Sequence, residues 1–279
     1  MDRFLMGNVL ENSLFVQKRD KFEELSKAVE SFNVQYNGSN IIQDDIFSVL
    51  KNYARTKEIE LESLRFPTKD DDFCALTCIK KGKIFVYVNS WLPLSKQIFA
   101  AAHELYHIWC YIEEKDTSVL RKGSFLNASD MDEDVKSNED REANAFSGLL
   151  LVPPKLLFEQ MNIYRISREN QNLEDVIQLM AIFSVPFKAI LLRLYEERFM
   201  DINKVKMFLE MNKESVKKAI DYVADAQRWQ RRTPEIIQMG NLKRMLDQNQ
   251  EHELLAASRI KSDKEILEEI LQRHTINRG

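Results

Sequence analysis

The sequence predicts an α+β protein in which a small sheet packs against a mostly helical body. Gly and Pro are scarce, at 7 and 6 of 279 residues, which favours helices joined by few tight turns. Most of the chain carries apolar residues at helical spacing, whereas residues 59–89 contain short strand-like runs around a single glycine. We therefore expect a helical N-terminal segment, a small sheet, and helices that continue to the C-terminal end.

Two helices are expected before the sheet. Residues 10–32 and 46–54 each repeat apolar side chains about one helical turn apart. The segment 36–40, Tyr-Asn-Gly-Ser-Asn, separates them, because such residues favour turns over continued helix.

The sheet is expected between residues 59 and 89. Residues 59–64 alternate polar and apolar side chains, as a half-buried strand does. The runs 73–79 and 84–89 are also strand-like, and the Gly-containing turn 80–83 between them predicts a hairpin.

A central helix is predicted over residues 96–111, with Ser95 as its N-cap. The stretch 113–142 holds ten acidic residues against five Lys or Arg, and we expect a long loop or flap there. The next helix should begin near Ser137 and end at residues 152–154, Val-Pro-Pro.

Further helices are expected to follow as far as the end of the chain. Asn212, Thr233-Pro234 and Ser262 are predicted helix starts, and residues 262–265 fit a capping box.

The central helix contains His103-Glu104-Leu105-Tyr106-His107, the pattern His-Glu-x-x-His. Residues four apart share a helix face, so both imidazoles can reach one metal ion. This is the geometry of a zinc hydrolase, in which Glu104 acts as the general base toward water. The flanking residues are apolar, which predicts a buried helix whose polar side chains need partners. Tyr106 either faces the cleft or packs elsewhere.

A catalytic zinc site needs a third protein ligand, and the sequence offers several acids for it. Glu113 lies ten residues after His103, but it would require a sharp turn at Cys110, where the helix instead continues. A carboxylate from the following helix is the more consistent choice.

Three acids lie at the start of that second helix. Asp140 shares a face with the apolar residues that should point inward, Glu139 lies near that face, and Glu142 points sideways. Asp140 is also the acid that a capping box with Ser137 would use, so two roles compete for one side chain. The residues alone leave all three acids open.

The His-Glu-x-x-His helix, followed by Arg-Glu-Ala-Asn-Ala-Phe-Ser-Gly-Leu-Leu-Leu-Val-Pro at 141–153, resembles the ImmA/IrrE family of zinc metallopeptidases. The resemblance implies a gluzincin-like zinc endopeptidase with His103 and His107 as metal ligands and Glu104 as catalytic base. It implies Asp140 as the third ligand, where the family usually has Glu. It also implies that the substrate is a protein, in this family usually a helix-turn-helix repressor encoded nearby, in bacteria or their mobile elements.

The resemblance covers about residues 40–205, which we assign to a metallopeptidase domain. Residues 1–39 then form an N-terminal helical segment. Residues 206–279 form a helical C-terminal extension through which the protein could self-associate. Two alternatives stay open, namely a binding module that sequesters a regulator and a toxin or phage-defence effector.

Composition and charge limit the function further. The net charge of −4 gives no support to bulk nucleic-acid binding, and no direct contact with nucleic acid is expected. The three cysteines are expected to be reduced thiols. With no signal peptide and no membrane span evident in the sequence, a cytoplasmic location is expected.

Overall fold

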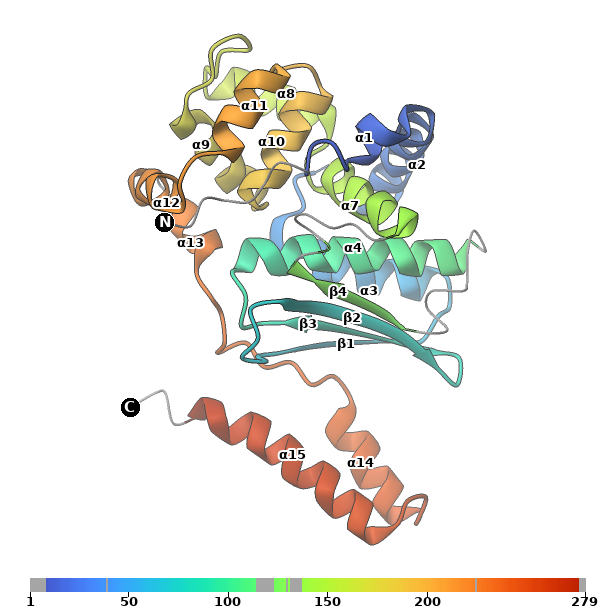
Figure 1. Cartoon of the computed structure of the whole chain (residues 1–279). Coiled ribbons are helices and arrows are strands. Elements are labelled where there is room, and N and C mark those ends of the chain that lie inside the picture. Colours follow the sequence, from blue (N-terminus) through green and yellow to red (C-terminus); the bar gives the residue numbers. More distant parts are fainter. Residues whose placement is uncertain are drawn as a thin grey trace.

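The computed structural model describes residues 9–38, 40–113, 123–128, 130, 137–223 and 225–275, and it has the predicted α+β class. Helices cover one face of a four-stranded sheet, and the last two helices form a hairpin that stands away from the body (Figure 1). Across these residues no single helix is long and apolar enough to cross a membrane. The helices Leu173–Phe183 and Phe187–Glu196 are long and apolar enough only when taken together, and they are bent by 103° relative to each other.

The sheet has the order β1-β3-β2-β4. Strand β1 is parallel to β3, and the pairs β2–β3 and β2–β4 are antiparallel. The predicted hairpin is confirmed as the β2–β3 pair. The strands are β1 (Leu61–Phe66), β2 (Phe73–Lys80), β3 (Lys83–Asn89) and β4 (Ser124–Asn127).

Strand β4 corrects the expectation of a continuous loop over 113–142. Ser124 and Leu126 are buried while Phe125 is 63% exposed, the alternation of a half-buried edge strand. Much of the expected loop lies outside the described residues, namely 114–122, 129 and 131–136.

The central helix, α4 (Leu94–Ile112), begins earlier than predicted. Pro93 is its N-cap, and Ser95 lies inside the first turn, where its hydroxyl accepts a hydrogen bond from Gln230 Nε2 at 3.1 Å. The predicted N-cap at Ser95 is therefore wrong, because the helix already starts directly after the proline.

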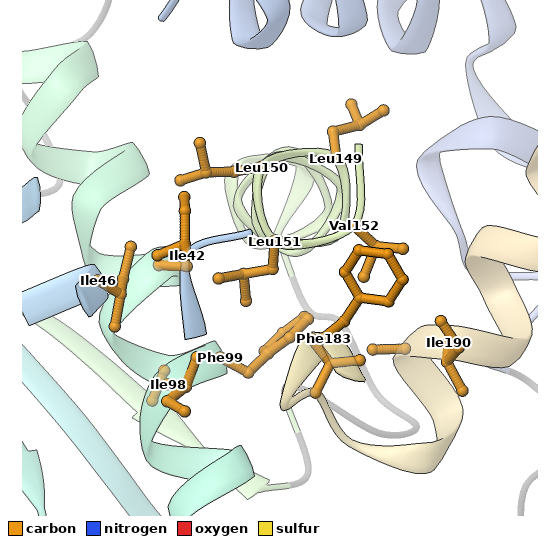
Figure 2. Close-up of a cluster of buried hydrophobic side chains, with 14 of the residues drawn as sticks. Ile42, Ile46, Ile98, Phe99, Leu149, Leu150, Leu151, Val152, Phe183 and Ile190 are labelled. Carbon is orange, nitrogen blue, oxygen red and sulfur yellow. The ribbon is translucent and has the colours of Figure 1, made fainter. Parts of the chain in front are cut away.

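Helix α4 lies between the sheet and a second layer of helices (Figure 1). Its apolar face packs on the sheet, and its upper face contacts α7 (Asn138–Leu151). Figure 2 shows Leu150 and Leu151 of α7 in one buried cluster with Phe99 of α4 and Phe183. Two N-terminal helices join this layer through contacts with α7: α1 (Leu14–Gln17) and α2 (Arg19–Asn37). Helix α3 (Ile46–Thr56) instead packs beside α4 and against β1.

The segment after α7 is helical, as expected. Asn212 caps a helix as predicted, because its side chain accepts from the backbone N–H of Ser215. The helices are α8 (Pro154–Ile163), α9 (Leu173–Phe183), α10 (Phe187–Glu196), α11 (Ile202–Leu209), α12 (Lys213–Tyr222) and α13 (Ala226–Gln230).

Residues 231–241, here called the strap, contain turns and two isolated β-bridges but no helix, and this corrects the predicted helix start at Thr233-Pro234. The Thr233 hydroxyl accepts a hydrogen bond from buried Gln97 Nε2 at 2.8 Å, so it does not cap a helix. Farther along, the backbones of Gln238 and Arg65 exchange two hydrogen bonds at the outer edge of β1. The strap therefore pairs with the free edge of β1, on the side opposite β3.

The strap leads into α14 (Leu242–Glu251) and α15 (Ala257–Thr275). Ser262 lies within α15, so the capping box predicted there is wrong. The two helices contact mainly each other. Leu254 and Leu255 in the connection between them, and Ile266 of α15, are exposed. The three-part division of the chain and self-association through this hairpin stay predictions.

Two truncations test whether the strap contributes more to the stability of the protein than the hairpin of α14 and α15 does. A chain ending at Asn241 is expected to melt near the temperature of the full chain, since α14 and α15 contact each other more than the body. A chain ending at Gln230 removes Gln238, which pairs with the backbone of buried Arg65, and Ile236, whose carbonyl accepts from the hydroxyl of buried Ser90. Each buried polar group left without a partner costs about 1–3 kcal/mol, so this chain should melt several degrees lower. Equal melting of both truncated chains by calorimetry would contradict the structural role of the strap.

Candidate active site

His103 and His107 lie one turn apart on the face of α4 that meets α7. Their Nε2 atoms are 3.1 Å apart, and both side chains are buried. Burial, together with the neighbouring His103, lowers the pKa of His107 to about 3, so its imidazole is neutral. A neutral imidazole can offer a nitrogen lone pair to a metal, and the two Nε2 atoms converge on one point as metal ligands do.

Asp140 lies opposite the two histidines, in the first turn of α7. Its Oδ1 atom is 3.7 Å from His103 Nε2 and 3.9 Å from His107 Nε2. The ligand atoms of the three residues all lie within 4.8 Å of one another. The structure thus brings together the two histidines and the acid named from the sequence.

The two roles that compete for Asp140 turn out to use different oxygens. Ser137 caps α7 by accepting from the Asp140 backbone N–H, and its hydroxyl donates to Asp140 Oδ2 at 2.7 Å. Oδ1 is left facing the histidines. Burial by itself would raise the pKa of Asp140, but its interactions with His103 and Ser137 outweigh burial and hold the pKa below its ordinary value. Asp140 is therefore ionised and oriented.

The other acids considered from the sequence do not join this group. Glu142 accepts a hydrogen bond from the Tyr106 hydroxyl at 2.6 Å. Glu113 is paired with Lys57 at 2.8 Å. Glu139 is not among the acids close to the histidines in the part of the chain that the structure describes.

Tyr106 is buried beside the site and packs on Phe146, with ring centroids 5.5 Å apart. Burial, with smaller contributions from Cys110 and Glu142, raises the pKa of its hydroxyl. Since that hydroxyl already donates to Glu142, the packing interpretation of Tyr106 agrees with the structure.

Glu104 is fully buried on α4 beside the histidines. Neither oxygen of its carboxylate has a hydrogen-bond partner within the described residues. Burial raises the pKa of Glu104 to about 7, against opposing effects of His103 and Thr77. The Thr77 hydroxyl on β2 is thus near this carboxylate, although no hydrogen bond of standard geometry joins them. A buried carboxylate without donors is costly for folding, which favours a chemical role for Glu104.

Asn144 contacts His103, and the sequence alone did not single it out as part of the site. Its side-chain Oδ1 lies 2.9 Å from His103 Nδ1, and its Nδ2 donates to the Asp130 carbonyl at 3.0 Å. The amide therefore accepts from the Nδ1–H of His103, which leaves the Nε2 lone pair for a metal. The available signal was its spacing, because Asn144 lies one helical turn after Asp140.

Replacing Asn144 with Ala should lower zinc affinity, since the His103 ring loses the partner that holds its tautomer and orientation. Loss of such an outer-shell partner typically costs about 10–100-fold in metal affinity. Competition with a chromophoric chelator would measure this. Asn138→Ala is the matched control, as Asn138 is an exposed residue of the same helix whose side chain accepts from Arg141 Nη1 at 3.1 Å. Equal zinc affinity in both variants would contradict the proposed role of Asn144 in positioning His103.

The residues present fit a catalytic zinc ion. Two imidazole nitrogens and one carboxylate oxygen are the ligands of many catalytic zinc sites, where the fourth position stays open to water or substrate. The Glu104 carboxylate, which has no hydrogen-bond donor among the described residues, lies on the same helix, next to His103. Cys110 does not belong to the group.

Comparison with known proteins agrees with this site. Residues 54–195 match the family model Peptidase_M78, described as the IrrE N-terminal-like domain. The matched range contains the four strands, α4, α7 and every residue of the site. No curated protein matches the chain.

Proposed function

Because this chain belongs to the IrrE N-terminal-like peptidase family, as its paired motifs predict, we propose that it is a zinc-dependent endopeptidase that cleaves a regulatory protein. The observation that carries the proposal is the convergence of His103, His107 and Asp140 beside the buried carboxylate of Glu104. A binding protein would need no such carboxylate next to the metal ligands.

His103, His107 and Asp140 would hold the metal. When bound, Zn²⁺ supplies a Lewis acid that makes water a stronger acid and polarises the scissile carbonyl. Asp is shorter by one methylene than the Glu usual in the family, so α7 has to approach α4 closely. Ala143, fully buried on α7, is small enough to allow that approach.

Glu104 would carry the proton in both halves of the reaction. It accepts a proton from the attacking water and delivers it to the nitrogen of the leaving amine. A pKa of about 7 suits both steps, because the group can gain and lose a proton near neutral pH. Asn144 keeps His103 in the ligating tautomer, and Ser137 keeps Asp140 oriented.

For the substrate we propose a helix-turn-helix repressor encoded by a neighbouring gene. This part rests on the family resemblance. Support would come from incubating the zinc-loaded protein with the purified product of that gene and following the intact substrate on a gel. The substrate should disappear with zinc, persist when a chelator removes the metal, and disappear again when zinc is restored. A substrate that binds stoichiometrically and stays intact under all three conditions would instead favour the sequestering module.

A further inference from the structure

Thr77 places a buried hydroxyl group in the middle of β2. The residue is 0% exposed, and its Oγ1 atom has no hydrogen-bond partner among the described residues. Thr77 pairs with Val86 on β3 and with Ser124 on β4, so it lies inside the sheet and not at an edge. Buried hydroxyl groups in folded proteins are nearly always hydrogen-bonded, so this one requires an explanation.

The side chain of Thr77 points to the face of the sheet that α4 covers (Figure 1). Thr77 and Arg65 lie on one face, because their partners on β3 are two residues apart. Arg65 donates to Gln97 of α4 at 2.7 Å, which identifies this face as the one under α4. Among the strands, α4 contacts β2 most extensively. Glu104 lies in the middle of that helix, as Thr77 lies in the middle of the strand.

The carboxylate of Glu104 is the polar group that meets this hydroxyl. Glu104 is also fully buried, and neither of its carboxylate oxygens has a hydrogen-bond partner within the described part of the chain. Burial raises the pKa of Glu104 to about 7, and the opposing effects come from the charge of His103 and from the nearby Thr77 hydroxyl. A hydrogen bond from Thr77 to Glu104 would therefore give a partner to two of these three buried oxygens at once.

A hydroxyl group at this position costs stability unless it has such a partner. Valine has nearly the shape of threonine, and it would fill the same space beside Ala75 and Val86 without a polar atom. A general base, in contrast, gains from a neighbouring donor, because the base must direct one oxygen at the proton that it takes. Threonine suits this position better than valine only if its hydroxyl bonds to Glu104.

We propose that the Thr77 hydroxyl donates a hydrogen bond to one carboxylate oxygen of Glu104 and so keeps the other oxygen directed at the attacking water. The inference rests on the proposed peptidase function and adds a positioning residue, which acts through Glu104. The site is then oriented from two sides, since Ser137 holds Asp140 from α7 and Thr77 holds Glu104 from the sheet.

A thermodynamic cycle on the full chain, at matched zinc content, tests the contact without any substrate. Thr77→Val should lower the melting temperature by about 3 °C or more, the effect of removing a hydrogen bond to a carboxylate. In a Glu104→Leu background the same substitution should leave the melting temperature unchanged or raise it, because the hydroxyl then has no partner to lose. An equal effect of Thr77→Val in both backgrounds would overturn the proposal.

Kinetics with two conservative substitutions distinguish positioning from packing. Thr77→Val keeps the shape and removes the hydroxyl, whereas Thr77→Ser keeps the hydroxyl and removes a methyl group. Thr77→Val should lower kcat by about 10–100-fold at unchanged KM and zinc affinity, and Thr77→Ser should retain most of the rate. Thr68→Val is the matched control, because the Thr68 hydroxyl shares a hydrogen bond with Tyr87, which points to the opposite face of the sheet.

Failure of this proposal differs from failure of the proposed function. An unchanged kcat in Thr77→Val, a loss as large in Thr77→Ser, or a rise in KM in place of the fall in kcat would each overturn the positioning role of Thr77. If the peptidase function is wrong, the unmodified protein leaves its substrate intact. The melting cycle then decides by itself whether Thr77 bonds to Glu104.

Discussion

Replacing Glu104 with Gln is expected to leave zinc bound and to reduce peptide cleavage by about 10²–10⁴-fold, the usual contribution of a general acid–base group. Gln has the shape of Glu but cannot accept and release the proton. Glu104 is 0% exposed and its carboxylate has no donor among the described residues, so the neutral amide should be tolerated in the same space. The measurement is the single-turnover rate of substrate cleavage, together with zinc content of the same preparation.

Glu113→Gln is the matched control, because Glu113 directly follows α4 and bonds to Lys57 and Tyr53 away from the metal ligands. That variant should cleave at the rate of the unmodified protein. If Glu104→Gln cleaved as fast as Glu113→Gln, the assigned role of Glu104 would be wrong.

Asp140→Ala should have the second large effect, a loss of zinc affinity greater than the roughly 10–100-fold typical of outer-shell residues. The reason is geometric, since Asp140 Oδ1 is the carboxylate oxygen that faces both histidines. Glu142→Ala removes an acid from the same helix that bonds to Tyr106 and should retain zinc. Dialysis against a graded zinc buffer, followed by metal analysis, compares the two.

Two outcomes of this comparison would change the ligand assignment. Zinc loss in Glu142→Ala but not in Asp140→Ala would mean that α7 rotates when metal binds. Retention of zinc in both would direct attention to Glu139, the remaining acid of that turn. Melting curves of the metal-free variants separate a lost ligand from a lost fold.

The local parts of the site could be predicted from the sequence. The spacing of His103 and His107 determines that they share a helix face, and Ser137 marks the start of α7 through its own side chain. Neither inference requires knowing what packs against these helices. The β2–β3 hairpin was predictable for the same reason, as its turn lies between adjacent strands.

The parts that depend on distant contacts were not predictable. Strand β4 has four residues and exists through pairing with β2, some fifty positions earlier. The strap is not helical, because its hydrogen bonds with β1 and Gln97 override the helix start suggested by Thr233-Pro234. The choice among three acids likewise depends on how α7 is rotated against α4. Helix α7 is oriented with Ala143 and Phe146 buried and with Glu142 bonded to Tyr106. In this orientation Asp140 faces the two histidines.

X-ray absorption at the zinc edge tests the metal centre most directly. With one equivalent of zinc, we expect scattering from nitrogen and oxygen only, including two imidazoles at about 2.0–2.1 Å. Asp140→Ala should change the oxygen component and keep both imidazoles, provided that zinc is supplied in excess. A sulfur shell at about 2.3 Å, or a spectrum with fewer than two imidazoles in the unmodified protein, would contradict a site made by His103, His107 and Asp140.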